Sequence, residues 1–191
     1  KSAPIGCALF LILQFPYSKI MHIIVDAHED LAHNIQAFGR DYTRPVAETR
    51  RLEKGSPTVE YTGETLFGYP EYQQGKIALI FATLFAPPRR YQNDEWAKYS
   101  YKNADEAHRL YRSQIDIYRR LVEEHPDKFE IIRNTLDLNL LLSKWQDAEE
   151  KHPHPTGMVL LMEGAEGIRS PEELEEWWGL GLRIIGPAWV G

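Results

Sequence analysis

The chain has 191 residues, of which 43% are hydrophobic and 26% are charged, a balance typical of a folded globular domain. Its net charge of −6 and its pI near 5.7 argue against a nucleic-acid partner, because nucleic-acid-binding surfaces are basic. The single cysteine, Cys7, excludes an internal disulfide framework and a multi-cysteine zinc site. A metal site in this chain must therefore be built from histidine and carboxylate side chains.

The first twenty residues differ from the rest of the chain. Their apolar run, residues 7–13, is too short to span a bilayer. It could be a minimal signal region, but Lys1 is the only charge before it and no small-x-small cleavage site follows. Met21 stands directly before the first expected strand. We therefore expect residues 1–20 to be an upstream, expression-derived or signal-like extension, residues 21–191 to form the domain, and the protein to be cytoplasmic.

Short apolar runs recur along the domain and predict strands. The run at residues 77–85 is apolar almost throughout, as expected for a parallel strand covered on both faces. The expected strands lie near residues 23–27, 77–85, 158–163 and 183–188. Helical patterns separate them, so the sequence predicts an α/β fold of βαβ units with a parallel sheet.

Capping signals place helices between these strands. Asn103 and Glu106 form a capping pair, and the helix that follows ends before Pro126. Its buried face is expected to comprise Ala104, Ala107, Tyr111, Ile115, Tyr118 and Leu121. A second helix is expected over about residues 136–150, and a capping box at residues 170–173 begins a third. The buried face of the third is expected to comprise Leu174, Trp177 and Trp178.

A long polar stretch, residues 39–75, connects the first two expected strands. Connections of this length inside a compact domain are uncommon and are usually functional or disordered. A short helix is expected within it from Pro45 to Lys54, with Gly55 as its stop signal. The stretch is a candidate lid over a substrate site, and a merely decorative insertion is the alternative.

The pentad Asp-Ala-His-Glu-Asp at residues 26–30 carries the strongest chemical signal. Alternate side chains of a strand point to one face, so Asp26, His28 and Asp30 are expected to project together. An imidazole beside a carboxylate suits zinc or a similar divalent ion. The spacing alone is weak, and a strand end with solvated polar residues is the alternative. Asp26 could orient a metal ligand or could be an inward structural carboxylate.

A second candidate group is Glu163, which ends the apolar run from Met158 and precedes Gly164. A carboxylate at the C-terminal end of a parallel strand lies where catalytic residues gather in barrels, although a glutamate turned to water is the alternative. His152 and His154 could hold a stray metal ion, but a proline-interrupted polar loop is more often simply solvated.

Four stretches, in this order, resemble the membrane (renal) dipeptidases, peptidase family M19: residues 25–32, 75–85, 159–164 and 181–189. Residues 39–45 also look like the loop after the first strand in the bacterial branch of that family. The resemblance covers about residues 22–191. It implies a (β/α)₈ TIM barrel of the metal-dependent hydrolase type, which typically needs about 250 residues. The chain would then supply about the first half of the barrel.

The resemblance also implies a function and a cofactor. The function is a zinc-dependent dipeptidase-like hydrolase that cleaves a short peptide or amide bond with a metal-bound hydroxide. His28, Asp30 and Glu163 would hold one zinc ion, and Glu163 would be the catalytic carboxylate that bridges to a second. The second zinc would need two histidines from later strands, so this chain alone is expected to be inactive and to bind at most one zinc weakly. The alternative is a fragment or degenerate member of the family that acts as a non-enzymatic binding module.

Two places depart from the animal dipeptidases. Trp189 stands where that branch has a histidine that contacts the substrate carbonyl, and it is the candidate substrate-binding residue. Ala165 and Glu166 replace the Gly-His that follows the bridging glutamate there. The exact peptide or amide substrate therefore stays open, as does a homodimer, and neither a nucleic-acid partner nor a membrane span is expected.

Overall fold

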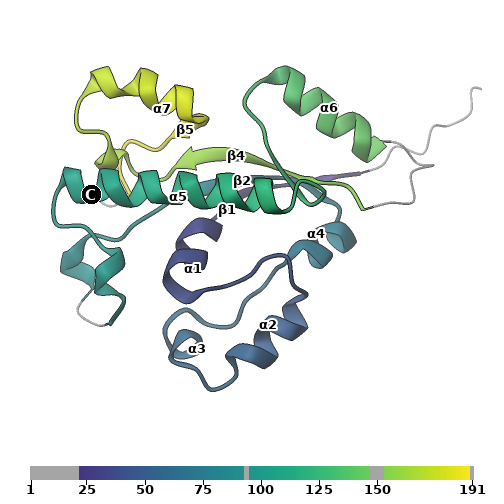
Figure 1. Cartoon of the computed structure of the whole chain (residues 1–191), viewed down its shortest axis with the longest axis horizontal. Helices are drawn as coiled ribbons and strands as arrows, with labels where there is room; N and C mark the ends of the chain where they lie inside the picture. Colours follow the sequence, from purple (N-terminus) through teal and green to yellow (C-terminus); the bar gives the residue numbers. More distant parts are fainter. Residues whose placement is uncertain (1–21, 93–94, 147–152, 190–191) are drawn as a thin grey trace, which may run out of the picture.

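Five parallel strands form one sheet in the computed structural model, which describes residues 22–92, 95–146 and 153–189 (Figure 1). They are β1 (Ile24–Glu29), β2 (Ile77–Leu84), β3 (Phe129–Ile131), β4 (Thr156–Met162) and β5 (Leu182–Ile185). β2 lies between β1 and β4. The other edge of β4 pairs with β3 along its first residues and with β5 along its last. The predicted α/β fold with a parallel sheet is confirmed, and so are the strands predicted for it.

The sequence analysis missed β3, because three residues in a polar context are too few for a periodic pattern. β3 pairs with residues 156–158 at the beginning of β4, and Thr156 N donates to Lys128 O at 2.8 Å. The short strand therefore widens the sheet only beside the N-terminal residues of β4.

Helices α1 (Leu31–Phe38), α2 (Val46–Glu53), α3 (Pro57–Thr62) and α4 (Tyr69–Gly75) lie between β1 and β2. The stretch expected to be mainly a loop is thus largely helical, and the helix predicted within it corresponds to α2. Later in the chain follow α5 (Ala104–Glu124), α6 (Thr135–Gln146) and α7 (Leu174–Leu180). The last residues of the second predicted helix, 147–150, lie outside the described part of the chain. No helix among the described residues is long and apolar enough to cross a membrane.

Helix α5 begins as its capping signal predicts. The Asn103 side chain accepts a hydrogen bond from Glu106 N at 3.0 Å, while the Glu106 carboxylate accepts one from Lys102 N at 2.8 Å rather than from the Asn103 backbone. The predicted buried face is correct except at Ala104, which is exposed because it is the first helical residue. Tyr111 and Tyr118 are almost fully buried in the core.

Helix α7 differs from its prediction. A 3₁₀ turn, η4 (Pro171–Glu173), precedes it, and the Ser170 side chain makes no capping hydrogen bond. Trp177 is 1% exposed, but Leu174 and Trp178 are 45% and 60% exposed. Positions four residues apart share one helix face, and here that face turns to solvent. Arg183 lies over the Trp178 ring, 3.7 Å from its centroid.

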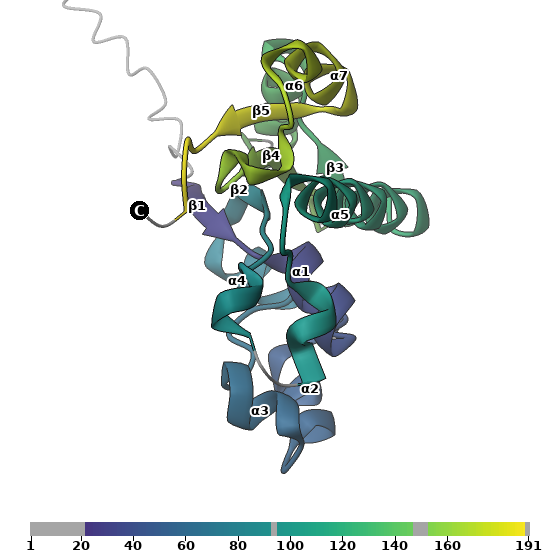
Figure 2. The same cartoon turned by 90° about the vertical axis from the view of Figure 1, so that its left-hand side faces the viewer.

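Two clusters of buried side chains occupy the two faces of the sheet. The larger includes Ile80 and Leu84 of β2 and is covered by α1, α4 and α5. Figure 2 shows α5 and α1 on the same side of the sheet. The smaller includes Leu79 of β2 and Leu141 and Trp145 of α6. β2 is therefore covered on both faces, which explains its nearly continuous apolar sequence.

Candidate metal centre

The structure brings the Glu163 side chain to His28 and Asp30, from which more than a hundred residues separate it in sequence. His28 and Asp30 lie at the end of β1, and Glu163 lies at the end of β4, two strands away. His28 Nε2 is 3.6 Å from Asp30 Oδ1 and 3.6 Å from Glu163 Oε1. One ligand atom from each of the three lies within 4.8 Å of the others. All three predicted metal ligands therefore meet at one end of the sheet.

The spacing of these atoms fits a single zinc ion. Tetrahedral zinc holds nitrogen and oxygen ligands at about 2.0–2.2 Å, which places two ligand atoms roughly 3.4 Å apart. The two 3.6 Å separations from His28 are close to that value. A neutral imidazole and two carboxylates also balance a divalent charge. The donor set is therefore suitable in both chemistry and spacing.

A register shift in β1, between Asp26 and Glu29, decides which side chains of this strand face the cluster of His28, Asp30 and Glu163. Asp26 pairs with Ile80 and Glu29 with Ala82, which places Asp26 and Glu29 on the same face of the sheet. His28 then shares the opposite face with Asp30, so the expectation that Asp26 projects with them is wrong. Asp26 Oδ1 instead accepts a hydrogen bond from His28 N at 3.1 Å. Asp26 thus fixes the backbone of His28 where the strand is irregular.

Thr83 of β2 holds Asp30 in place. Its hydroxyl donates to Asp30 Oδ1 at 2.5 Å, and its side chain is fully buried between β1 and β4. Its carbonyl oxygen accepts a hydrogen bond from the hydroxyl of Tyr118, on α5, at 2.8 Å. Sequence reasoning overlooked Thr83, although a hydroxyl group in an otherwise apolar strand was an available signal.

The surroundings of Glu163 shift the pKa of its carboxyl group and fix the position of its backbone. Burial and then the nearby Asp30 carboxylate raise the pKa of Glu163, whereas His28 acts in the opposite direction. Gly186 packs against its backbone, since a Cβ at residue 186 would lie 2.3 Å from Glu163 O. Only glycine permits this approach without displacing the end of β4.

The sequence analysis did not single out the carboxyl group of Glu29, which lies next to His28 and Asp30 in the sequence. Its side chain is 1% exposed and accepts a hydrogen bond from the Tyr72 hydroxyl. Burial raises the pKa of Glu29 to about 8, so the group is mainly neutral at pH 7. Because Glu29 faces the larger core cluster, it lies on the opposite side of β1 from His28. It therefore belongs to the core rather than to the cluster of His28, Asp30 and Glu163.

A cavity of about 250 Å³ adjoins the cluster of His28, Asp30 and Glu163, and Asp30 forms part of the cavity wall. Aromatic rings line much of it. The Trp189 ring lies 5.0 Å from the Phe85 ring and 6.2 Å from the Tyr91 ring, measured between centroids. Trp189, the candidate substrate-binding residue, thus stands beside the cluster.

The other histidine candidates lie elsewhere. His152 is outside the described residues. His154 lies before the beginning of β4, at the opposite end from Glu163, where its backbone oxygen accepts hydrogen bonds from Tyr69 and Gln73. It is therefore not part of the cluster of His28, Asp30 and Glu163.

The contact between Thr83 and Asp30 leads to a testable prediction. Replacing Thr83 with valine keeps the shape but removes the hydroxyl that orients Asp30. Loss of such a supporting hydrogen bond typically lowers metal affinity about 10- to 100-fold. We expect a loss in this range in a calorimetric zinc titration, with affinity largely retained in Thr83→Ser. Equal affinities in the valine variant and the unsubstituted protein would show that Thr83 does not support the site.

The chain is similar to several solved structures. The probable dipeptidase PvdM from Pseudomonas aeruginosa matches 88% of this chain with a TM-score of 0.62 and 15% identity, over 35% of its own length. A metallo peptidase from Rhodobacter sphaeroides, liganded with a phosphinate mimic of the dipeptide L-Ala-D-Ala, matches 87% with a TM-score of 0.60 and 16% identity, over 45% of its length. The chain thus spans less than half of these structures. At these identities the similarity concerns the fold, a TIM-barrel type of which the described residues form a part.

No curated protein matches the sequence significantly. The sequence profile of the family described as "Membrane dipeptidase (Peptidase family M19)" matches residues 19–191, nearly the whole chain. This agrees with the resemblance found in its motifs. The chain belongs to the membrane dipeptidase family, peptidase family M19.

Proposed function

We propose that the protein is a zinc-dependent hydrolase that cleaves a short peptide or amide bond, with His28, Asp30 and Glu163 as zinc ligands. The observation that carries the proposal is the convergence of these side chains, which approach within 4.8 Å of one another from two separate strands. Family membership supports the reaction class, since the family is described as one of dipeptidases.

Each residue would have a distinct part in the reaction. When bound, zinc activates a water molecule and polarises the scissile carbonyl group. His28 supplies the neutral donor, and Asp30 and Glu163 supply the negative charge that balances the ion. Thr83 keeps Asp30 oriented through its hydroxyl. Glu163 would also help to hold a second zinc ion, as the resemblance to the family implies.

Trp189 is proposed to contact the substrate. It forms the aromatic wall of the adjoining cavity together with Phe85 and Tyr91, and Asp30 contributes to the same cavity. A peptide whose scissile bond lies at the cluster could therefore place an adjacent side chain against these rings.

The test is hydrolysis of a dipeptide panel by the full-length protein that contains residues 1–191, with zinc and after chelation. We expect turnover only with zinc, and a fall of about 100-fold or more in Glu163→Gln, because this variant loses a metal-binding carboxylate. Turnover that survives both chelation and this substitution would contradict the proposal. Zinc binding without turnover of any dipeptide would instead favour the non-enzymatic binding module.

A further inference from the structure

Two adjoining hollows of about 320 and 440 Å³ lie beside the loop that follows β2, and both carry an excess of positive charge. Their linings share Arg89 and Lys102. The charged side chains around them are five cations and two carboxylates: Arg89, Arg90, Lys98, Lys102, Arg109, Glu106 and Glu166. The whole chain, by contrast, has a net charge of −6.

None of these cations forms an ion pair within the ranges that the structure describes. Both carboxylates are engaged by neutral donors. Glu106 accepts a hydrogen bond from Lys102 N at 2.8 Å. Glu166 accepts hydrogen bonds from Trp189 N and from the Tyr111 hydroxyl, both at 3.4 Å. The side-chain charges of Arg89, Arg90 and Lys102 are thus left for an external anion.

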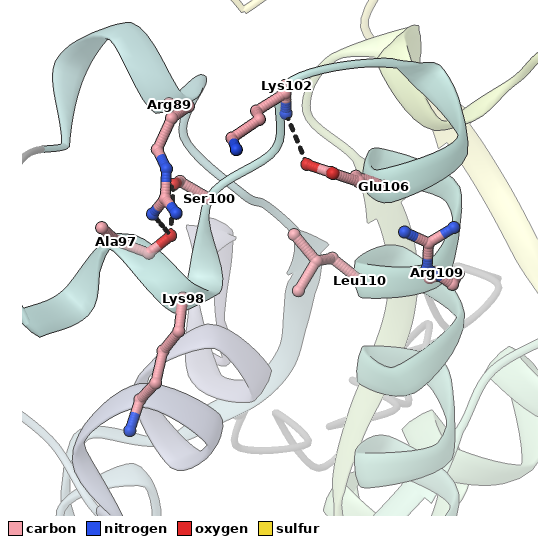
Figure 3. A pocket seen from close by; sticks show the side chains of 8 residues that line it. All are labelled: Arg89, Ala97, Lys98, Ser100, Lys102, Glu106, Arg109 and Leu110. Atoms are coloured by element: carbon pink, nitrogen blue, oxygen red, sulfur yellow. Dashed lines mark hydrogen bonds between the residues drawn. The ribbon is translucent and has the colours of Figure 1, made fainter.

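Arg89 and Lys102 line both hollows, and the side chain of Lys102 extends toward that of Arg89. The Arg89 guanidinium is held by hydrogen bonds to Ala97 O and to Ser100 Oγ, the latter at 3.4 Å. In Figure 3 the Lys102 side chain extends toward that guanidinium, whereas Lys98 points away from it. A fixed guanidinium with free N–H groups beside an ammonium group is a favourable arrangement for a carboxylate.

The loop that carries these cations is tied together by its backbone. Arg89 N donates to Tyr101 O at 2.7 Å, and Tyr101 N donates to Pro87 O at 3.1 Å. These bonds bring Arg89 and Lys102 together although the two are thirteen positions apart in sequence. Their placement therefore belongs to the folded loop and does not need a ligand to form.

The larger hollow also adjoins the aromatic wall of the cavity that is lined by Asp30 and Trp189. Arg90 lies over the Tyr91 ring, 4.9 Å from its centroid, and Tyr91 in turn lies against Trp189. Glu166, which lines this hollow, binds the backbone of the same Trp189. The hollow thus borders Tyr91 and Trp189, two of the aromatic residues that line the proposed substrate cavity.

We propose that the larger hollow, with Arg89, Arg90 and Lys102, binds the carboxylate of an acidic side chain on the peptide substrate. This inference rests on the proposed function, because it assigns a specificity to the same site. Arginine and lysine discriminate a carboxylate from an amide of equal size through its charge and its two acceptor oxygens. Peptides that contain glutamate are therefore preferred over those that contain glutamine.

The experiment measures binding of Ala-Glu and of Ala-Gln without metal, by chemical-shift titration at low salt. The two peptides are nearly isosteric and differ by one charge. We expect Ala-Glu to bind about tenfold more tightly, with the preference falling as salt is added. Lys102→Gln and Arg90→Gln should each remove most of the preference. Arg89 is left unchanged because its substitution would also release Ala97 O.

Lys76→Gln is the matched control. Lys76 is exposed and precedes β2, so it lies at the other end of that strand from the hollow. Equal affinity for both peptides would overturn the inference, as would equal loss of preference in Lys76→Gln and Lys102→Gln. Binding of inorganic phosphate at the same residues without any preference for Ala-Glu would overturn it as well.

A companion assay separates this inference from the proposed function. If zinc-dependent turnover is observed with equal kcat/KM for Ala-Glu and Ala-Gln, the specificity fails and the hydrolase stands. If the metal-free preference for Ala-Glu is present and no dipeptide is turned over, the anion site stands and the proposed hydrolase fails.

Discussion

Replacing His28 with alanine is expected to lower zinc affinity by at least about 100-fold in a calorimetric titration. His28 supplies the sole nitrogen donor of the cluster, and its Nε2 lies 3.6 Å from both carboxylates. Without it only Asp30 and Glu163 remain, two carboxylates that repel each other, and the described part of the chain places no third ligand with them. The loss should therefore be nearly complete.

His22→Ala is the control for this prediction. His22 is exposed and stands two residues before β1, so its removal subtracts an imidazole without touching the cluster. We expect its zinc affinity to match that of the unsubstituted protein. Equal losses in the two alanine variants, or no loss in either, would show that zinc binds elsewhere.

The pH dependence of zinc binding follows from Glu163. Its pKa is raised by burial and by Asp30, so it retains its proton at pH values where an ordinary glutamate is ionised. Zinc must displace that proton, and the affinity should fall as the pH is lowered through the raised pKa. Zinc titrations across a pH series should show this fall beginning above the ordinary range for glutamate. Affinity that stays constant down to that range would contradict the assignment of Glu163 as a ligand.

The second large effect is expected for Tyr118→Phe, which should lower the free energy of unfolding by about 2–3 kcal/mol. The buried Tyr118 hydroxyl donates to Thr83 O at 2.8 Å and accepts from Ala32 N at 3.2 Å. Removing it leaves two buried backbone groups without this partner, and each such group typically costs about 1–3 kcal/mol. Denaturant unfolding monitored by tryptophan fluorescence measures the change.

The control for this change is Tyr99→Phe. Tyr99 is only partly buried, and its ring contacts the Lys98 ammonium, a contact that does not use the hydroxyl. Its unfolding free energy should shift by no more than about 0.5 kcal/mol. If Tyr118→Phe cost as little as that, the hydroxyl would not be the link between α5 and the strand behind the site.

The sequence was most informative where a pattern is local. Apolar runs predicted the long strands, and the three- and four-residue spacing after Asn103 predicted the buried face of α5. Motifs resembling the family singled out His28, Asp30 and Glu163, and the structure brings these residues together. Their role as zinc ligands stays a prediction.

Contacts between distant elements escaped the sequence analysis. The shift of register in β1 separates Asp26 from His28, and strict alternation cannot foresee such an irregularity. The support of Asp30 by Thr83 depends on two neighbouring strands, and the support of Thr83 by Tyr118 depends on a helix packed behind them. The cations around Arg89 are likewise brought together by a folded loop.

X-ray absorption at the zinc edge, combined with anomalous diffraction from crystals of the zinc-loaded protein, tests the metal centre most directly. We expect an anomalous peak between His28, Asp30 and Glu163, with one nitrogen and two carboxylate oxygens as protein ligands at about 2.0–2.2 Å. A zinc ion located elsewhere, or one at this place that is not bound to His28 and Glu163, would contradict the assignment of these residues as a metal site.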